Sequence, residues 1–268
     1  MSLALILGQG RLAKLLAAAH PDAHRLSLEG FAPDGLEVEP FRIEALGSVL
    51  ADLRGRGVER VCLAGAVHRT EVDPDRIDAA TAPLVPRLMA RMGQGDGALL
   101  SEVLRIFEEA DLEPVAVQDL LPDLLPRHGV LGAIEPDDRA RADAARAAEV
   151  LASVGAADLG QGCVVAGGLV VAVEALPGTD FMLQTLALAR GEGPLRRAMP
   201  PGGVLMKAPK PGQDRRIDWP SIGPGTVAQA SAAGLCGIVV PAGGGLVLDR
   251  DATIAAADDA DLFLWITE

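Results

Sequence analysis

The stretch LALILGQGRLAKLLAAAH, residues 3–20, carries the pattern on which the fold prediction rests. Leu3–Leu7 is a short apolar run that predicts a buried strand, and Gly8-Gln9-Gly10 predicts a tight turn after it. The Ala and Leu residues of Arg11–His20 recur at helical spacing. A strand that leads through a glycine turn into a helix is typical of α/β proteins with parallel strands.

The same alternation continues along the first half of the chain. Further strands are predicted at His24–Leu28, Arg60–Ala64 and Pro114–Val117, with a helix at Leu46–Gly55. Strands that alternate with helices form parallel sheets joined by helical crossovers. The predicted fold class is therefore α/β, with a Rossmann-like, doubly wound N-terminal domain over residues 1–133.

The pattern changes in the second half, where we predict a C-terminal mixed α/β domain over residues 134–268, opening with a helix at Asp137–Gly155. Two glycine-rich turns, Gly167-Gly168 and Gly243–Gly245, each lie between short apolar runs, which is a hairpin signal. Antiparallel pairs are therefore expected in this domain. The flanking runs are Cys163–Ala166, Leu169–Glu174, Gly237–Val240 and Leu246–Leu248.

Composition restricts the class of partner. Hydrophobic residues make up 49% of the 268 residues, but aromatic residues only 3%, and Tyr is absent. A surface that stacks nucleic-acid bases needs aromatic side chains, which this chain mostly lacks. Its formal charge of −13 also repels phosphate backbones and anionic lipid surfaces. We therefore predict that nucleic acid is not a partner.

The cysteines and the apolar runs indicate a compartment. Cys62, Cys163 and Cys236 lie far apart and form no Cys-x-x-Cys pair, so we expect buried, reduced thiols. The N-terminus lacks the pattern of a signal peptide, and the longest apolar runs are too short to span a bilayer. A cytoplasmic protein is the prediction.

The N-terminal glycines fit the loose G-x-G-x-x-G/A pattern, with Ala13 in the last position. In such loops Gly8 and Gly10 let the backbone approach a diphosphate, and the following helix offers free N–H groups. Glu29 lies where an acidic residue would meet a ribose. The pattern cannot separate a nicotinamide dinucleotide from a uridine diphosphate, and a turn that binds nothing is the alternative.

Two further loops of the first half are candidates for ligand contact. Gly65 and Arg69 follow the predicted strand Arg60–Ala64, at the edge where parallel sheets bind ligands, although Arg69 could simply be solvated. Asp96 lies among three glycines, where it could contact a ligand or cap the next helix. His68 has no histidine at zinc-ligand spacing, so a zinc site is not expected.

The second half is denser in unusual polar residues. Glu174 ends an apolar strand, and Gly178-Thr179-Asp180 opens a predicted helix, so the two acids could converge, although Thr179 or Asp180 could only cap the helix. Residues 207–218 combine two Lys, two Arg and two Asp, which could be a solvated loop. Carboxylates that hold Mg²⁺ beside cations that hold phosphate oxygens are what diphosphate hydrolysis requires.

Several of these blocks, in the same order, resemble one family over essentially the whole chain. They are residues 8–12, the Asp158–Gln161 run, Glu174 with Gly178-Thr179-Asp180, and the Gln213–Pro220 block with Ile222-Gly223 and Thr226. The chain is similar to the UDP-2,3-diacylglucosamine pyrophosphatase family that replaces the calcineurin-like enzyme in some Gram-negative bacteria. The GTD block and the Q-D-x-R-x-D-x-P block are its most specific parts.

The resemblance implies a reaction and a cofactor. Water would attack the diphosphate of UDP-2,3-diacylglucosamine with the help of Mg²⁺, releasing UMP and 2,3-diacylglucosamine 1-phosphate, in lipid A biosynthesis. It also implies roles for individual residues. Asp218, Asp214, Lys207 and Arg215 would be catalytic, and Asp218, Asp180 and Glu174 would hold the metal. Substrate would contact Gly8, Gln9, Gly10, Gly65, Arg69, Asp96, Gln161, Gly178, Thr179, Gln213, Arg216 and Thr226.

The sequence departs from the family pattern at two places, where Leu176-Pro177 precedes Gly178 instead of a Glu and Gln9 replaces a Gly. Two other readings stay open: a nicotinamide-dependent oxidoreductase, based on Gly8, Gly10 and Glu29, and a protein that binds a nucleotide sugar or lipid without catalysis. We also expect a homodimer, and at most transient membrane contact through the substrate's acyl chains.

Overall fold

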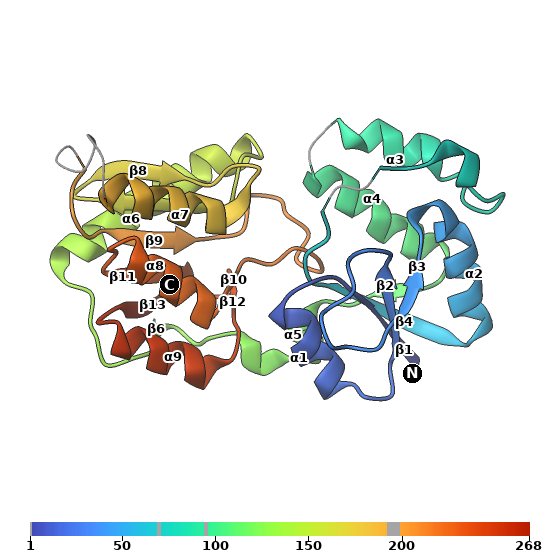
Figure 1. Cartoon of the computed structure of the whole chain (residues 1–268), viewed down its shortest axis with the longest axis horizontal. Helices are drawn as coiled ribbons and strands as arrows, with labels where there is room; N and C mark the ends of the chain where they lie inside the picture. Colours follow the sequence, from blue (N-terminus) through green and yellow to red (C-terminus); the bar gives the residue numbers. More distant parts are fainter. Residues whose placement is uncertain (1, 69–70, 94–95, 192–198) are drawn as a thin grey trace. The chain divides into compact units, whose positions relative to one another are not determined.

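The computed structural model describes residues 2–68, 71–93, 96–191 and 199–268, and its contacts divide the chain into two units (Figure 1). Unit 1 comprises Met1–Pro122 with Asp214–Asp218, and unit 2 comprises Asp123–Gln213 with Trp219–Glu268. This division differs from the expected 1–133 and 134–268. Strand β6 (Gly129–Val130) pairs with β13, the last strand of unit 2. Unit 2 therefore begins before residue 129, and not at residue 134 as predicted.

Unit 1 is built on a parallel five-stranded sheet with the order β3-β2-β1-β4-β5. This is the order of the first five strands of a doubly wound 3-2-1-4-5-6 sheet, so the predicted α/β class is confirmed. The strands are β1 (Ser2–Leu7), β2 (His24–Leu28), β3 (Glu39–Phe41), β4 (Val58–Ala64) and β5 (Glu113–Pro114). The helices are α1 (Arg11–Ala19), α2 (Leu46–Gly55), α3 (Val85–Met92), α4 (Asp96–Glu109) and α5 (Val117–Leu120), with short 3₁₀ turns at Ile43–Ala45 and Pro74–Arg76.

The core of unit 1 follows from the alternation of side chains along its strands. Ala4 and Val61 are fully buried and belong to one cluster with Leu53 of α2 and Phe107 of α4. Leu5, the next residue of β1, is also fully buried and points to the opposite face. Strands buried on both faces read as continuous apolar runs, which is why Leu3–Leu7 predicted a strand so clearly.

Unit 2 contains a six-stranded sheet with the order β6-β13-β11-β9-β7-β8, and a two-stranded parallel pair, β10 with β12. The adjacent strands β13, β11 and β9 are parallel to one another, whereas β6 is antiparallel to β13, and β7 is antiparallel to both β9 and β8. The strands are β7 (Gly162–Ala166), β8 (Leu169–Val173), β9 (Val204–Lys207), β10 (Ser221–Ile222), β11 (Gly237–Pro241), β12 (Leu246–Val247) and β13 (Phe263–Thr267). The helices are α6 (Asp138–Ala156), α7 (Gly178–Gly191), α8 (Pro224–Ala232) and α9 (Arg250–Asp259). A 3₁₀ turn at Pro122–Leu124 includes the division between the two units.

Both faces of the larger sheet are covered. Val164, Leu205 and Ile238 share a cluster with buried residues of α7, α8 and α9, whereas Cys163 and Val204 share another with the alanines and Leu151 of α6. Successive side chains of one strand therefore pack into the hydrophobic clusters on opposite faces of the sheet. Helix α6 can pack closely because its buried face is mainly alanine, a small residue with high helix propensity.

The two predicted hairpins have different outcomes. The Gly167-Gly168 turn joins β7 to β8 as predicted, and the buried Asp143 of α6 accepts hydrogen bonds from both glycine N–H groups at 2.9 and 2.6 Å. The Gly243–Gly245 prediction is wrong, because β11 pairs with β9 and β13 whereas β12 pairs in parallel with β10. A local glycine turn shows that the chain bends, but not which strand it then pairs with.

Two smaller predictions also need correction. The strand expected at Pro114–Val117 is only Glu113–Pro114, and helix α5 begins at Val117. Cys62 and Cys163 are buried, and burial raises the pKa of each thiol to about 12, but Cys236 is exposed. Within the described residues, no helix combines the length and apolarity needed to cross a membrane.

Candidate functional site

The glycine loop of unit 1 follows β1 and lies beside the loop that follows β4. Gly8 donates its N–H to Ala64 O at 2.8 Å, and Gln9 and Ala66 exchange backbone hydrogen bonds at 2.9 and 2.8 Å. A Cβ on Gly8 would lie 2.5 Å from Ala66 O, and a Cβ on Gly65 would lie 2.6 Å from Gly8 O. Both glycines are therefore required by the approach of one backbone to the other.

Gly10 has a different role from Gly8. Its φ is 109°, in the region that favours glycine, and a Cβ there would meet no atom within 4 Å. It is the N-cap of α1, which has no side-chain cap and no acidic residue in its first turn. The first N–H groups of α1 thus lie at the carboxyl end of β1, where the strand order reverses and α/β sheets bind anions.

Two other predicted residues of unit 1 lie wholly or partly outside the described residues. Arg69 lies outside the described residues, and so does the side chain of Asp96, although Asp96 opens α4. His68 is exposed, and its ring centroid lies 6.1 Å from that of Phe31. The roles of Arg69 and Asp96 therefore stay predictions.

Glu174 is the most enclosed acidic candidate of unit 2. It directly follows β8, is 7% exposed, and accepts a hydrogen bond from Thr179 Oγ1 at 2.5 Å. A Cβ on Gly162 would lie 2.6 Å from Glu174 Oε2, and a Cβ on Gly160 would collide with the Glu174 backbone. The two glycines therefore leave the space that the carboxylate occupies.

Lys207 and Gln161 lie in the same neighbourhood. Lys207 is the antiparallel partner of Gly162, so its side chain is on the sheet face where a Gly162 side chain would lie, the face of Glu174 Oε2. Lys207 is 8% exposed and donates to Ser221 O at 3.2 Å. Gln161 Oε1 is buried without a hydrogen-bond partner among the described residues. The predicted residues Glu174, Thr179 and Lys207 thus come together around Gly162, and Gln161 directly precedes this glycine in sequence.

The remaining predicted residues of unit 2 have local roles or exposed positions. Asp180 is exposed in the first turn of α7, and Gly178 precedes it with φ 86°. The Thr226 hydroxyl accepts a hydrogen bond from Gly223 N at 3.3 Å and so caps α8. Gln213 Oε1 accepts a hydrogen bond from Lys210 N at 2.9 Å. These contacts stabilise a helix start and a turn, whatever else the residues bind.

The charged block expected to hold substrate forms ion pairs within itself and with two acids outside it. Arg216 forms hydrogen bonds with both carboxylate oxygens of Asp214 at 3.0 and 2.7 Å, and an ion pair with Glu108 of α4 at 2.5 Å. The hydrogen bond from Arg216 is the main cause that lowers the pKa of Asp214. Lys210 pairs with Asp158 at 2.5 Å. The Asp214–Asp218 segment, which includes the exposed Arg215 and Asp218, belongs to unit 1.

A metal held by protein groups alone is not supported. Within the described parts of the chain, no three His, Cys, Asp or Glu residues are grouped so that they could hold a metal ion. Mg²⁺ often needs only one or two carboxylates, and takes the rest of its ligands from water and substrate phosphates. The Glu174 carboxylate and the unpartnered Gln161 Oε1 are oxygen donors of the type that Mg²⁺ prefers, so the residues fit an ion that binds together with a diphosphate.

Comparison with known proteins places the whole chain in one family. The N-terminal domain of LpxI matches residues 2–124, and the LpxI C-terminal domain matches residues 127–265. The chain belongs to the LpxI family. It is also 40% identical over 273 residues to the UDP-2,3-diacylglucosamine pyrophosphatase LpxI of Caulobacter vibrioides, covering 98% of this chain and 96% of that one. The LpxI domains meet between residues 124 and 127, close to the Pro122–Asp123 division of the structure.

Sequence reasoning missed two residues beside the charged block of this LpxI-family chain. Glu108 pairs with Arg216, and Gln118 donates Nε2 to Arg215 O at 2.9 Å. Neither residue stands in a recognisable motif. Glu108 is only one of two adjacent acids on an amphipathic helix. Only their position in the folded unit identifies them.

Proposed function

We propose that this chain catalyses the Mg²⁺-dependent hydrolysis of UDP-2,3-diacylglucosamine to UMP and 2,3-diacylglucosamine 1-phosphate, in lipid A biosynthesis. Membership of the LpxI family supports the substrate, because the Caulobacter relative carries that activity in its name. The observation that carries the proposal is the polar group around Gly162, where Glu174 and Lys207 are both buried within one unit. Buried charges of opposite sign suit a doubly charged diphosphate better than an apolar ligand.

Residues of unit 2 would bind the metal ion and the phosphate oxygens. Glu174, oriented by the Thr179 hydroxyl, and Gln161 Oε1 would hold Mg²⁺ against the diphosphate, with Asp180 as a further carboxylate. Bound Mg²⁺ would supply charge neutralisation of the phosphate oxygens. Lys207 Nζ would bind a phosphate oxygen that gains charge, because a largely desolvated ammonium is a strong electrostatic stabiliser. Positioning and charge neutralisation provide most of the catalysis in phosphoryl transfer.

Unit 1 would contribute nucleotide binding and one carboxylate. The N-terminus of α1, which follows Gly10, offers backbone N–H groups to a phosphate of the uridine nucleotide. Asp218 would be the central carboxylate, orienting the attacking water or binding the metal. Arg215 is exposed on the same segment and would bind a phosphate oxygen. These roles rest on the family pattern and the positions of the residues within unit 1.

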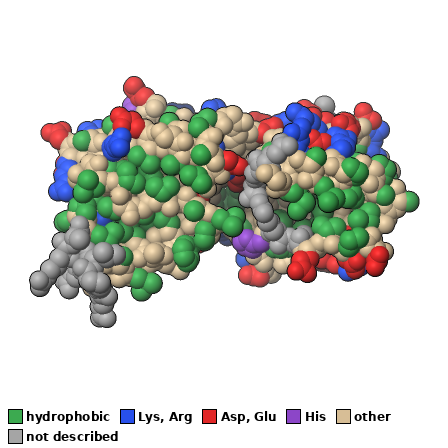
Figure 2. Space-filling model, turned by 90° about the horizontal axis from the view of Figure 1, so that it is seen from above, with side chains coloured by type: hydrophobic (Ala, Val, Ile, Leu, Met, Phe, Trp, Pro, Cys, Tyr) green, Lys and Arg blue, Asp and Glu red, His purple; other side chains and the backbone are tan. Residues whose placement is uncertain are grey.

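The acyl chains require an apolar surface next to the polar group. Leu176, Phe181 and Leu188 are 81%, 56% and 77% exposed, and the first two lie within two residues of Glu174 and Thr179 respectively. Figure 2 shows a broad hydrophobic area over the unit that carries α6–α9. This surface supports binding of fatty-acyl chains, and it is also where transient contact with a membrane would occur.

A homodimer stays a prediction of the sequence. The edge strand β8 supports it, because Leu169 and Val170 are exposed and the segment Leu169–Val173 contains no charged residue. An uncharged surface reduces the repulsion between two copies of a chain with charge −13. Sedimentation equilibrium tests this, and a monomer at all concentrations would refute it.

The test of the proposed function is incubation of the purified chain with UDP-2,3-diacylglucosamine, with Mg²⁺ or with excess chelator. Phosphorus NMR should show UMP and the sugar 1-phosphate only when metal is present. Asp218→Ala in saturating Mg²⁺ should lower turnover by about 10²-fold or more, as the loss of one strong transition-state contact does. Cleavage in chelator would refute the metal requirement. No cleavage at all would refute the hydrolase, and titration of nicotinamide fluorescence would then test the oxidoreductase reading.

A further inference from the structure

The Asp214–Asp218 segment belongs to unit 1, although the residues before and after it belong to unit 2. It carries Asp218, the carboxylate on which the proposed reaction depends most. A short segment that is separated in sequence from the rest of its unit needs specific contacts to stay in one conformation, because ordering each residue costs conformational entropy. The contacts that supply this order identify the residues that determine where Asp218 lies.

Arg216 is the centre of these contacts. Within the segment, Asp214 accepts hydrogen bonds from Arg216 N and Nε at 3.0 Å each, and from Nη2 at 2.7 Å. Outside the segment, Glu108 Oε1 of α4 accepts from Arg216 Nη1 at 2.5 Å. One guanidinium thus joins two carboxylates, and its pKa is raised by both hydrogen bonds. A cation neutralised in this way is poorly suited to bind substrate phosphate, so we assign Arg216 a positioning role instead of the predicted substrate contact.

One further contact joins the segment to the rest of unit 1, and another orders the segment internally. Gln118 of α5 donates Nε2 to the carbonyl oxygen of Arg215 at 2.9 Å. Ile217 is 9% exposed, and its N–H donates to Asp214 O at 3.3 Å. The segment is therefore fixed by a charged side chain, by its backbone and by an apolar side chain.

Asp218 follows directly and has φ 60°, in the left-handed region. Aspartate tolerates this region better than most residues, yet it still requires support from the surrounding structure. A left-handed residue at the end of an anchored turn has its Cα–Cβ direction set by the turn. If the anchor is released, the carboxylate loses that direction even though Asp218 itself is unchanged.

We propose that Glu108 and Gln118 are positioning residues for hydrolysis, which hold the Asp214–Asp218 segment so that Asp218 has its reactive orientation. The proposal rests on the proposed function for the role of Asp218. Neither residue needs to touch the substrate, because each acts through Arg216 or the Arg215 carbonyl. Removal of either contact should therefore lower kcat and leave KM nearly unchanged.

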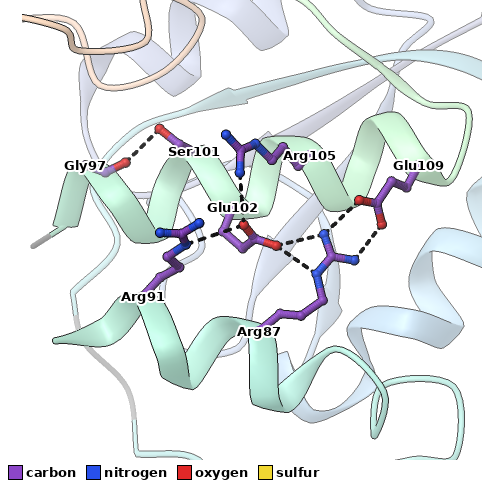
Figure 3. A network of polar contacts seen from close by, with 7 residues as sticks. All are labelled: Arg87, Arg91, Gly97, Ser101, Glu102, Arg105 and Glu109. Carbon is purple, nitrogen blue, oxygen red and sulfur yellow. Dashed lines mark hydrogen bonds and ion pairs between the residues drawn. The ribbon is translucent and has the colours of Figure 1, made fainter. Parts of the chain in front are cut away.

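Glu108→Gln tests the proposal, and Glu109→Gln is its matched control. Glu109 is the next residue of α4, and its carboxylate pairs with Arg87 of α3 at 2.5 Å and not with Arg216 (Figure 3). Both variants lose one carboxylate with an arginine partner. Glu108→Gln should lower kcat about 10-fold and raise hydrogen exchange at the Arg216 and Ile217 amides by a similar factor, since one charged hydrogen bond is lost. Glu109→Gln should change neither.

Each outcome decides one part of the proposal. Unchanged exchange at Arg216 and Ile217 in Glu108→Gln would overturn the anchoring, and so would equal exchange in the two variants. Raised exchange with unchanged kcat would overturn the positioning role. Gln118→Leu should repeat the Glu108→Gln result, and Glu108→Asp should recover part of kcat. If the native chain hydrolyses nothing, the proposed function fails, whereas the exchange measurements still show whether the segment is anchored.

Discussion

The two units use glycine for different purposes, although the sequence patterns look alike. In unit 1, Gly8 and Gly65 leave room for each other's backbone. In unit 2, Gly160 and Gly162 leave room for Glu174, whose carboxylate occupies the space above Gly162. A missing Cβ makes space in both cases, but only the second space is filled by an ionisable group. Glycine-rich loops therefore mark close approach in general, and a ligand is only one of the things that can approach.

The largest expected effect tests whether the Glu174 carboxylate, which occupies the space beside Gly162 in unit 2, takes part in the reaction. Glu174→Gln keeps the shape and the Thr179 contact but removes the charge, so we expect turnover to fall about 10²-fold. Thermal unfolding should change little, since the amide can still accept the hydrogen bond. Asp251→Asn is the control, because this acid is exposed in the first turn of α9 and has no predicted role in the site. Equal losses in the two variants would mean that Glu174 has no special position.

A smaller effect on stability tests the backbone contact in unit 1. Gly8→Ala places a Cβ 2.5 Å from Ala66 O, and we expect overpacking to cost about 1–3 kcal/mol of the free energy of unfolding. Gly55→Ala is the control, since it ends α2 in open space and Ala favours the helix. Urea unfolding measures both. If Gly8→Ala is as stable as the native chain, the two loops are free to separate and the comparison of the units fails.

The smallest expected effect concerns the thiols of the two units. Burial raises the pKa of Cys62 in unit 1 and of Cys163 in unit 2 to about 12, whereas Cys236 of unit 2 is exposed. Because the thiolate reacts and a raised pKa removes it, both buried thiols should stay unmodified at about pH 8. A disulfide reagent should then label Cys236 in the native chain and all three cysteines after denaturation. Labelling of Cys62 in the native chain would show that unit 1 opens locally.

Part of the candidate site was predictable, because residues of the family motifs stand at the ends of predicted strands, as Glu174 does after β8. Glu174, Thr179 and Lys207 were chosen from separate blocks, and the antiparallel pairing of β7 with β8 and β9 brings them to one place. The role of Arg216 toward substrate stays a prediction, whereas the ion pair of Arg216 could not be predicted. Its partner Glu108 is 108 residues away, and no local pattern indicates an ion pair across that separation.

By itself, the sequence determined the alternation of strands and helices, the parallel sheet of the first unit, the β7–β8 hairpin and the family. These features follow from side-chain periodicity and short motifs, which are properties of neighbouring residues. Only the tertiary structure decided that β11 and β12 do not pair, that Gly8 packs on a backbone, and that Asp214–Asp218 belongs to unit 1. The physical reason is that strand pairing, close packing and ion pairs depend on which distant segments meet, and local patterns carry no information about that.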